Sequence, residues 1–213
     1  VELAKRLEKL GADEVILQEG EDFRANVIAT FKGNSPAELL LFAHIDTVNT
    51  GDWEQFWNKK SGSDPRINPF GGADVDGAIW GRGAGDVKGG IATVLQALAH
   101  IKQNSLPLEK SVVVVFVADE ESGEPGMGLS NGVKSALPVV QKKSLNPALA
   151  VYLEPTELNI YTAQMGFQIV DIEITGKTSY FGKPELGIDA LKIGHQILAK
   201  LWEHDKTLKL EMK

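Results

Sequence analysis

Three short, strongly apolar segments constrain the fold of this chain more than any other feature. They lie at residues 39–43, 112–118 and 148–153 and are rich in Val, Leu and Ala. Continuous apolar runs of this length are typical of strands buried on both faces, as in a parallel sheet covered by helices. Between the first two runs, apolar residues recur at helical spacing, namely Val87, Ile91, Val94, Leu95, Leu98 and Ile101. This stripe predicts the crossover helix that parallel strands require. We therefore predict an α/β fold with a mostly parallel, twisted sheet and helices on both faces.

The hydrophobic pattern changes after Glu154. Residues 166–175 alternate apolar and polar side chains, which predicts a strand with one face in water. A second helical stripe follows, formed by Ile188, Leu191, His195, Leu198, Leu201 and Trp202. One strand and one helix cannot bury their own apolar surface, so we expect an incomplete second domain. The predicted boundaries are residues 1–164 for the first domain and 165–213 for the beginning of the second.

Composition excludes several classes of protein. The 213 residues carry a formal net charge of -7, which argues against the basic surface that binds nucleic acid or anionic lipid. The longest apolar run, residues 112–118, is much shorter than the ~20 residues that span a bilayer. Because cysteine is absent, a disulfide framework, a thiolate nucleophile and a Cys-ligated metal are excluded. We expect a cytoplasmic protein without a nucleic-acid or membrane partner.

Polar residues follow each of the three apolar runs. The first run continues into AHIDTV, the second into ADEESG and the third into LEPT, which supply His44, Asp46, Asp119, Glu120, Glu121 and Glu154. Ligands collect at the carboxyl ends of the strands in an open parallel sheet, so these side chains are expected at one edge. Asp86, in GRGAGDVKGG, joins them from the start of the predicted crossover helix, where the helix dipole favours an acid.

One imidazole among several carboxylates points to a bound cation. The carboxylates would repel each other strongly at the end of a dry sheet unless a cation joined them. Mixed imidazole and carboxylate ligation suits Zn²⁺, with Mn²⁺ or Co²⁺ as alternatives, and contains too much nitrogen for a typical Ca²⁺ site. We therefore expect a divalent metal at this edge.

The spacing of these residues suggests how they share the chemistry. His44 and Asp46 stand two apart on an extended segment and project to the same face, so the Asp46 carboxylate could accept a hydrogen bond from the His44 ring. Glu120 and Glu121 are adjacent and must diverge. One of them could bind metal while the other accepts a proton from water at the metal, and these are the two tasks of hydrolysis.

These stretches together resemble the M20 metallopeptidase family, the group of acetylornithine deacetylase, succinyl-diaminopimelate desuccinylase and glutamate carboxypeptidase. The matching stretches are AHIDTV, WGRGAGDVKGG, ADEESG and YLEPT, in the family's order and approximate spacing, and the likeness extends from Val1 to about Trp202. The resemblance implies a zinc-dependent hydrolase with two zinc ions, for which cobalt or manganese could substitute. It also implies that the second domain is a lid through which the protein forms a homodimer.

The resemblance assigns roles to individual residues. His44 and Glu154 would bind one metal, Glu121 would bind the second, and Asp86 would bridge the two. Asp46 would orient His44. Glu120 would be the general base that deprotonates the bridging water and returns the proton to the leaving amine. A cis peptide bond is implied directly after the bridging acid, at Asp86–Val87.

The chain departs from the family pattern in two places. A further His that ligates the second metal near the family's C-terminus is absent before Lys213, and His100, His195 and His204 lie on predicted helices that do not suit this role. We expect a chain truncated inside the lid, the alternative being a one-metal or inactive relative. In the lid loop, Tyr180 stands where the family has His. A tyrosine can donate one hydrogen bond but carries no positive charge at neutral pH.

Other motifs in the sequence have alternative explanations. GLSNG would make Ser130 a hydrolase nucleophile, but turn-rich residues precede it where a strand is required, so Ser130 suits a helix N-cap better. The glycine-rich GRGAGDVKGG satisfies neither the P-loop nor the dinucleotide pattern, so no nucleotide cofactor is expected. Trp53, Trp57 and Trp80 could wall a substrate cleft or pack locally, and Arg82 could pair with a substrate carboxylate or with a nearby acid.

The sequence thus predicts a metal-dependent amide hydrolase with a Glu general base. Its substrate would be an N-acyl amino acid or a small peptide, cleaved by a deacylase, desuccinylase or carboxypeptidase reaction. The alternative is a non-catalytic metal-binding or dimerisation fragment of the same scaffold.

Overall fold

The computed structural model divides the chain into two compact units, Val1–Ala163 and Gln164–Lys213. It describes residues 1–20, 25–58, 64–121, 130–142, 147–164, 166 and 170–211.

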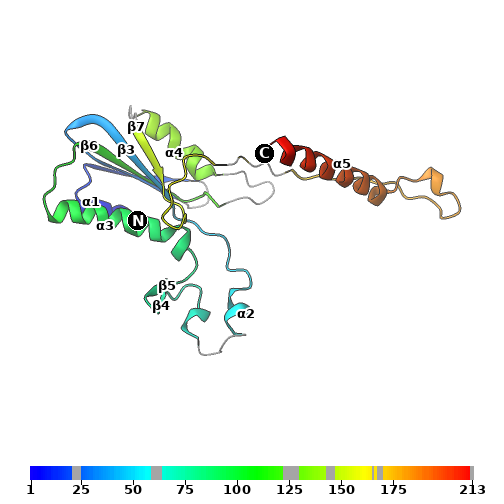
Figure 1. The fold of residues 1–213 in the computed structure, drawn as a ribbon, viewed down its shortest axis with the longest axis horizontal. Helices are drawn as coiled ribbons and strands as arrows, with labels where there is room; N and C mark the ends of the chain where they lie inside the picture. The colour runs from blue at the N-terminus through cyan, green and yellow to red at the C-terminus, as the bar shows by residue number, and fades with distance from the viewer. Residues whose placement is uncertain are drawn as a thin grey trace. The chain divides into compact units, whose positions relative to one another are not determined.

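The first unit is built on a five-stranded mixed sheet (Figure 1). The strands are β1 (Glu14–Glu19), β2 (Ala25–Phe31), β3 (Ser35–His44), β6 (Lys110–Val117) and β7 (Pro147–Tyr152), in the spatial order β1-β2-β6-β3-β7. The predicted apolar runs form β3, β6 and β7, and β3 pairs in parallel with both of the others. β1 and β2 add an antiparallel ribbon that pairs with β6. The predicted α/β class is confirmed.

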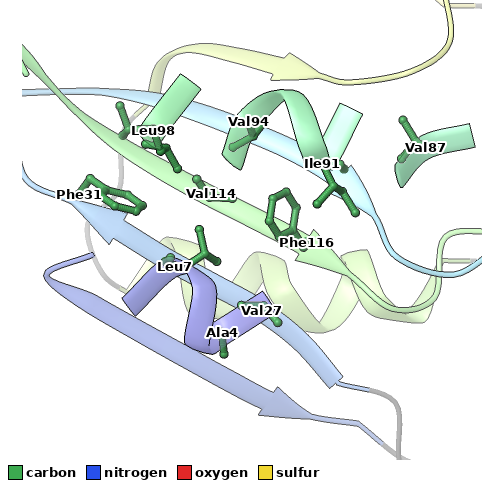
Figure 2. Packing of buried hydrophobic residues seen from close by; sticks show 13 residues of the cluster. Ala4, Leu7, Val27, Phe31, Val87, Ile91, Val94, Leu98, Val114 and Phe116 are labelled. Carbon is green, nitrogen blue, oxygen red and sulfur yellow. The ribbon is translucent and has the colours of Figure 1, made fainter. Parts of the chain in front are cut away.

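Helices cover both faces of this sheet, because alternate residues of each strand point to opposite sides. On one face, α1 (Glu2–Leu10) and α3 (Gly89–Gln103) pack on a cluster that includes Phe31, Val114 and Phe116 (Figure 2). α3 contributes Ile91, Val94 and Leu98 to this cluster, as its predicted apolar stripe requires. On the other face, α4 (Asn131–Lys142) packs on a second cluster formed with the intervening strand residues, which include Val113, Val115 and Val117. β6, at the centre of the strand order, contributes buried residues to both clusters.

The edge strand β7 is more exposed than its sequence predicts. All six of its residues are exposed, Leu149 to 60%, so the expectation that this run is buried on both faces is wrong. The reason lies in its position at the end of the strand order, where β3 is its neighbour. Among the described residues, the helices pack on β1, β2, β3 and β6, and no β7 residue joins either cluster.

Short elements connect β3 to α3. They are α2 (Trp53–Asn58), the 3₁₀ turn η2 (Pro65–Ile67), the hairpin strands β4 (Ala73–Val75) and β5 (Ala78–Trp80), and the turn η3 (Ala84–Lys88). Their aromatic side chains pack on one another. Trp57 is buried and meets Trp80 edge-on, with ring centroids 5.4 Å apart, while the Arg66 guanidinium lies 4.2 Å over the Trp57 ring. Of the two interpretations of these tryptophans, the structure supports local packing.

The second unit contains the turn η4 (Pro184–Leu186) and the helix α5 (Ala190–Glu211). α5 confirms the helix predicted from the second apolar stripe. The strand predicted over 166–175 is wrong for residues 170–175, which carry no strand, and residues 167–169 lie outside the described ones. A strand needs a hydrogen-bonded partner, and the pairing described in this unit is a single bridge between Lys177 and Ile188. Within the described residues, no helix combines the length and the apolar character needed to cross a membrane.

Candidate metal centre

The candidate site lies where the three parallel strands end. His44 is the last residue of β3 and pairs with Val117, the last residue of β6. Phe42 pairs with Tyr152, the last residue of β7, and the Phe42 carbonyl accepts a hydrogen bond from the Leu153 amide at 2.9 Å. This register brings the segment after β7, which carries Glu154, beside the end of β3. The parallel pairing therefore delivers residues from three distant segments to one sheet edge.

Three of the predicted metal ligands come together there. Nitrogen or oxygen atoms of His44, Asp86 and Glu154 all lie within 4.8 Å of one another. The His44 Nε2 atom is 3.0 Å from Asp86 Oδ1 and 3.7 Å from Glu154 Oε1. His44 is 1% exposed, whereas the two carboxyl groups are partly open to solvent. Asp86 belongs to η3, and the peptide bond Asp86–Val87 is cis, as the resemblance implies.

The hydrogen bonding of the His44 ring makes this group a candidate cation site. Nδ1 lies 3.0 Å from the main-chain carbonyl oxygen of Asp46. A carbonyl only accepts hydrogen bonds, so Nδ1 must carry the proton and a neutral ring directs the lone pair of Nε2 toward two carboxylates. That arrangement requires either a second proton on the ring or a cation between the three groups. One imidazole and two carboxylates form a donor set that suits a divalent metal.

The pKa values in this region reflect the same crowding of negative charge. Burial raises the pKa of Glu154, and the charges of Asp86 and Glu120 add to this effect, against opposing contributions from Tyr152 and His44. Burial lowers the pKa of His44, but the Asp46 carbonyl, the hydrogen bond to Asp86 and the nearby negative charges outweigh it, so that the net shift is upward. Negative charge near these groups contributes to both upward shifts, and a divalent cation would compensate that charge.

Asp46 occupies a different place from the one predicted. Its carboxylate is 3.8 Å from His44 Nδ1, and its main-chain carbonyl, not its side chain, holds the ring. The carboxylate instead accepts hydrogen bonds from the amide of Glu120, at 3.0 and 3.1 Å, and from the amide of Glu121, at 2.9 Å. Because these two amides satisfy the Asp46 carboxylate, it does not compete with the Asp46 carbonyl for the N–H group of the His44 ring. Asp46 therefore ties the end of β3 to the turn after β6.

Glu120 and Glu121 follow β6 in that turn. Burial raises the pKa of Glu121, with further contributions from the charges of Asp86, Glu120 and Asp46 and an opposing one from His44. Both carboxylates are therefore electrostatically coupled to the His44 group, although Glu121 lies outside the compact group of three identified among the described residues.

Sequence reasoning missed Tyr152. Burial raises the pKa of its phenol strongly, and the neighbouring carboxyl groups of Glu154 and Glu120 add to this effect. Its ring meets the Phe42 ring edge-on, with centroids 4.8 Å apart. The signal was available in the sequence: Tyr152 stands two residues before Glu154 at the end of a predicted strand, which places the two side chains on the same face.

Two other candidate residues have structural contacts. Ser130 directly precedes α4 and its carbonyl accepts the Lys134 amide, the bond expected of an N-cap residue, but the Asp119 carboxylate takes the Asn131 amide of the first turn. Arg82 lies with its guanidinium 5.3 Å from the Trp53 ring and donates to the Thr50 carbonyl at 3.4 Å, a contact that ties the connecting loop together.

Comparison with known proteins gives concordant results. The sequence model described as Peptidase family M20/M25/M40 matches residues 40–204. Acetylornithine deacetylase of Pasteurella multocida is 30% identical over 94% of this chain and 47% of its own length. The uncharacterized protein YgeY of Escherichia coli K12 is 28% identical over 97% of this chain and 46% of its own length. The chain thus spans about half the length of these curated relatives.

Solved structures show the same fold. An M20 family metallo-carboxypeptidase, Sso-CP2 from Sulfolobus solfataricus, aligns with 71% of this chain and 31% of its own, at 22% identity and a TM-score of 0.51. A tripeptidase from Staphylococcus aureus Mu50 aligns with 92% of this chain and 48% of its own, at 18% identity and a TM-score of 0.53. The family match covers most of the chain, including the strand ends that bring His44, Asp86 and Glu154 together. The chain belongs to peptidase family M20/M25/M40, whose metallopeptidases and deacylases use divalent metal.

Proposed function

We propose that this chain forms the metal-binding part of a zinc-dependent hydrolase that cleaves the amide bond of an N-acyl amino acid or a small peptide. The observation that carries the proposal is the state of the His44 ring. Nδ1 is committed to the Asp46 carbonyl, and Nε2 faces the carboxylates of Asp86 and Glu154 at 3.0 and 3.7 Å. Acetylornithine deacetylase among the relatives supports the substrate class.

The chain offers four residues to hold the metal. We propose two zinc ions, the first bound by His44 and Glu154, the second by Glu121, with Asp86 shared. Bound zinc would polarise the substrate carbonyl and acidify a water molecule. The Asp46 carbonyl would keep the proton on Nδ1, so that Nε2 is always the nitrogen presented to the site.

Glu120 would move the proton in this reaction. As a carboxylate, it would accept a proton from the water that attacks the carbonyl carbon, and would deliver that proton to the nitrogen as the C–N bond breaks. Asp46 supports this role, because its carboxylate binds the amides of Glu120 and Glu121 and fixes the turn that carries them. The Tyr152 hydroxyl is close to the carboxyl groups of Glu120 and Glu154 and would donate its one proton to one of them at a time.

The proposal also gives each of the two predicted domains a function. Residues 1–164 would be the N-terminal part of the catalytic domain, and residues 165–213 the beginning of a lid domain through which two copies associate. We propose that the protein works in the cytoplasm on small-molecule substrates.

Metal removal and replacement test the proposed activity. The protein, loaded with zinc, is incubated with N-acetylornithine and with a dipeptide, and the release of free amine is measured. Chelation should abolish hydrolysis of at least one substrate and added zinc should restore it. Hydrolysis that continues after complete chelation would contradict the proposal, as would a zinc-loaded protein that cleaves neither class of amide.

A further inference from the structure

Asn26 forms a polar connection beneath the turn that carries Glu120. Three polar or charged side chains are buried in the described part of the chain, namely Asn26, His44 and Asp119. His44 belongs to the candidate metal centre. The other two, Asn26 and Asp119, both form hydrogen bonds with the start of α4, near the end of β6. A buried amide is costly unless its donors and its acceptor are all satisfied, so its partners indicate what holds it there.

The Asn26 side chain joins four elements. Its Nδ2 donates to Gln18 Oε1 of β1 at 3.0 Å and to the Gly132 carbonyl of α4 at 2.9 Å. Its Oδ1 accepts the Ala118 amide, directly after β6, at 2.9 Å. The amide group has two N–H donors and one carbonyl oxygen, and this arrangement uses all of them. β1, β2, the end of β6 and the start of α4 are therefore joined at one side chain.

The Ala118 bond lies where the β2–β6 ladder stops. The regular register ends with Val27 opposite Phe116, so beyond that point the side chain of Asn26 takes over from the backbone of β2. After Ala118 the chain leaves the sheet and forms the turn that carries Glu120 and Glu121. The Ala118 amide stays hydrogen-bonded, because Asn26 Oδ1 accepts it.

The start of α4 packs against the same turn. The Asp119 carbonyl accepts the Gly132 amide at 3.2 Å, and the Asp119 carboxylate accepts the Asn131 amide at 3.1 Å. A Cβ atom on Gly132 would lie 2.8 Å from the Asp119 nitrogen and 3.2 Å from Asn26 Oδ1, so the absence of a side chain permits this approach. On the opposite side, the Asp46 carboxylate holds the Glu120 and Glu121 amides. The turn is thus clamped between Asn26 with α4 and Asp46.

We propose that Asn26 is a positioning residue that fixes residues 118–121 and thereby places the Glu120 carboxylate at the metal centre. The inference rests on the proposed function for its catalytic consequence, but its structural consequence can be measured independently. Asn26 touches none of the three residues of the compact His44 group, which come from β3, η3 and the segment after β7. Loss of its side chain should therefore displace Glu120, together with the neighbouring Glu121 that we propose as a ligand of the second zinc, and leave the zinc site of the compact His44 group in place.

The test compares Asn26→Ala with Ser111→Ala in the zinc-loaded protein. Ser111 is a matched control, because its hydroxyl accepts the Gly33 amide at 3.1 Å near the opposite end of β6. Asn26→Ala should lower kcat by about 10- to 100-fold, the range typical of displaced supporting groups, with KM within twofold of the original protein and the zinc of the His44 group retained. Ser111→Ala should lower the thermal midpoint and leave kcat unchanged.

Hydrogen exchange gives a readout that does not depend on activity. The amides of Glu120 and Glu121 should exchange at least tenfold faster in Asn26→Ala and at the original rate in Ser111→Ala, because only the first variant frees the turn. If Asn26→Ala does not fold, Gln18→Ala serves instead. It removes one partner of the Asn26 amide and should accelerate exchange at the same two amides to a smaller degree.

The outcomes separate this inference from the proposed function. Unchanged exchange at Glu120 and Glu121 in a folded Asn26→Ala protein overturns the positioning role, whatever the activity. Faster exchange at those amides with an unchanged kcat overturns its catalytic consequence. An original protein that hydrolyses no amide would contradict the proposed function alone, and exchange would still decide whether Asn26 holds the turn.

Discussion

At the scale of single residues, the candidate site is organised by main-chain groups as much as by side chains. The Asp46 carbonyl fixes the His44 ring, while the Asp46 carboxylate is occupied by two amides of the next segment. One residue thereby orients the imidazole and anchors the turn that carries Glu120. Because the His44 ring and the turn that carries Glu120 are held by different groups of Asp46, we expect substitutions of His44 and of Glu120 to have separable effects on metal binding and on turnover.

The first prediction contrasts Glu120 with His44. Glu120→Ala should retain zinc and lower kcat by about 10²- to 10⁴-fold, because a general base contributes that much without holding the metal. His44→Ala should lose bound zinc, since it removes the imidazole from the compact ligand group. Metal analysis after gel filtration and a single-turnover assay measure the two effects. Normal hydrolysis by the Glu120 variant would show that another group is the base.

The second prediction concerns Tyr152. Tyr152→Phe keeps the ring that packs against Phe42 but removes the hydroxyl that neighbours the carboxyl groups of Glu154 and Glu120. We expect kcat to fall by about 10-fold, in the range of lost supporting hydrogen bonds, and the thermal midpoint to change little. Tyr161→Phe is a suitable control, because Tyr161 is 71% exposed. Equal kcat values for the two variants would exclude a role for the Tyr152 hydroxyl.

At the scale of elements, close approach between α3 and the segment after β7 brings the ligands together. α3 begins immediately after the turn that carries Asp86, and a Cβ atom on Gly90 would lie 3.0 Å from the Leu153 Cβ and 3.1 Å from Val87 Cγ2. Leu153 directly precedes Glu154. The glycine therefore sets the distance between two segments that each supply a carboxylate.

The third prediction follows from this contact. Gly90→Ala should separate the start of α3 from Leu153 and weaken zinc binding by about 10-fold, the lower range for changes in groups that support ligands. Gly85→Ala is the matched control, because a Cβ atom at Gly85 meets nothing within 4 Å. Competition with a chromophoric chelator measures both affinities. Equal zinc affinities in the two variants would show that the Gly90 contact does not position the ligands.

At the scale of the whole molecule, the first unit carries all the residues proposed to bind metal and move the proton. It corresponds to Val1–Ala163 and contains the entire five-stranded sheet. Zinc that joins His44, Asp86 and Glu154 would connect β3, η3 and the segment after β7. Metal binding should therefore stabilise the fold of this unit as well as create the site.

The fourth prediction is a zinc-dependent stability. A ligand that binds the folded state adds about 2.7 kcal/mol when its free concentration is 100 times its dissociation constant. Thermal unfolding with and without a chelator should show a higher midpoint with zinc, and His44→Ala should remove most of this difference. A midpoint that does not respond to zinc, or that responds equally in His44→Ala, would place the metal elsewhere.

Some elements of this structure can be predicted from the sequence and others cannot. The central strands β3 and β6 and the helix α3 are marked by strong apolar patterns and were predicted from them. The ribbon of β1 and β2 was not: its two strands are neighbours in the chain, but the ribbon joins the sheet through the pairing of β2 with β6, which is far away in the chain. The exposure of β7 was mispredicted for a similar reason: an apolar run does not show whether a helix covers it.

For the site, the sequence by itself determined which side chains could meet, because parallel strands end at a common edge whatever their separation along the chain. His44, Asp86 and Glu154 do meet there, while their metal-binding roles, with those of Glu121, Glu120 and Asp46, stay predictions. Only the tertiary structure decided that the Asp46 carbonyl holds the His44 ring, that Tyr152 lies near two carboxyl groups and that the Asn26 side chain is hydrogen-bonded to β1, α4 and the residue after β6. Each of these contacts depends on distances of a few tenths of an ångström between elements, which packing sets and periodicity does not encode.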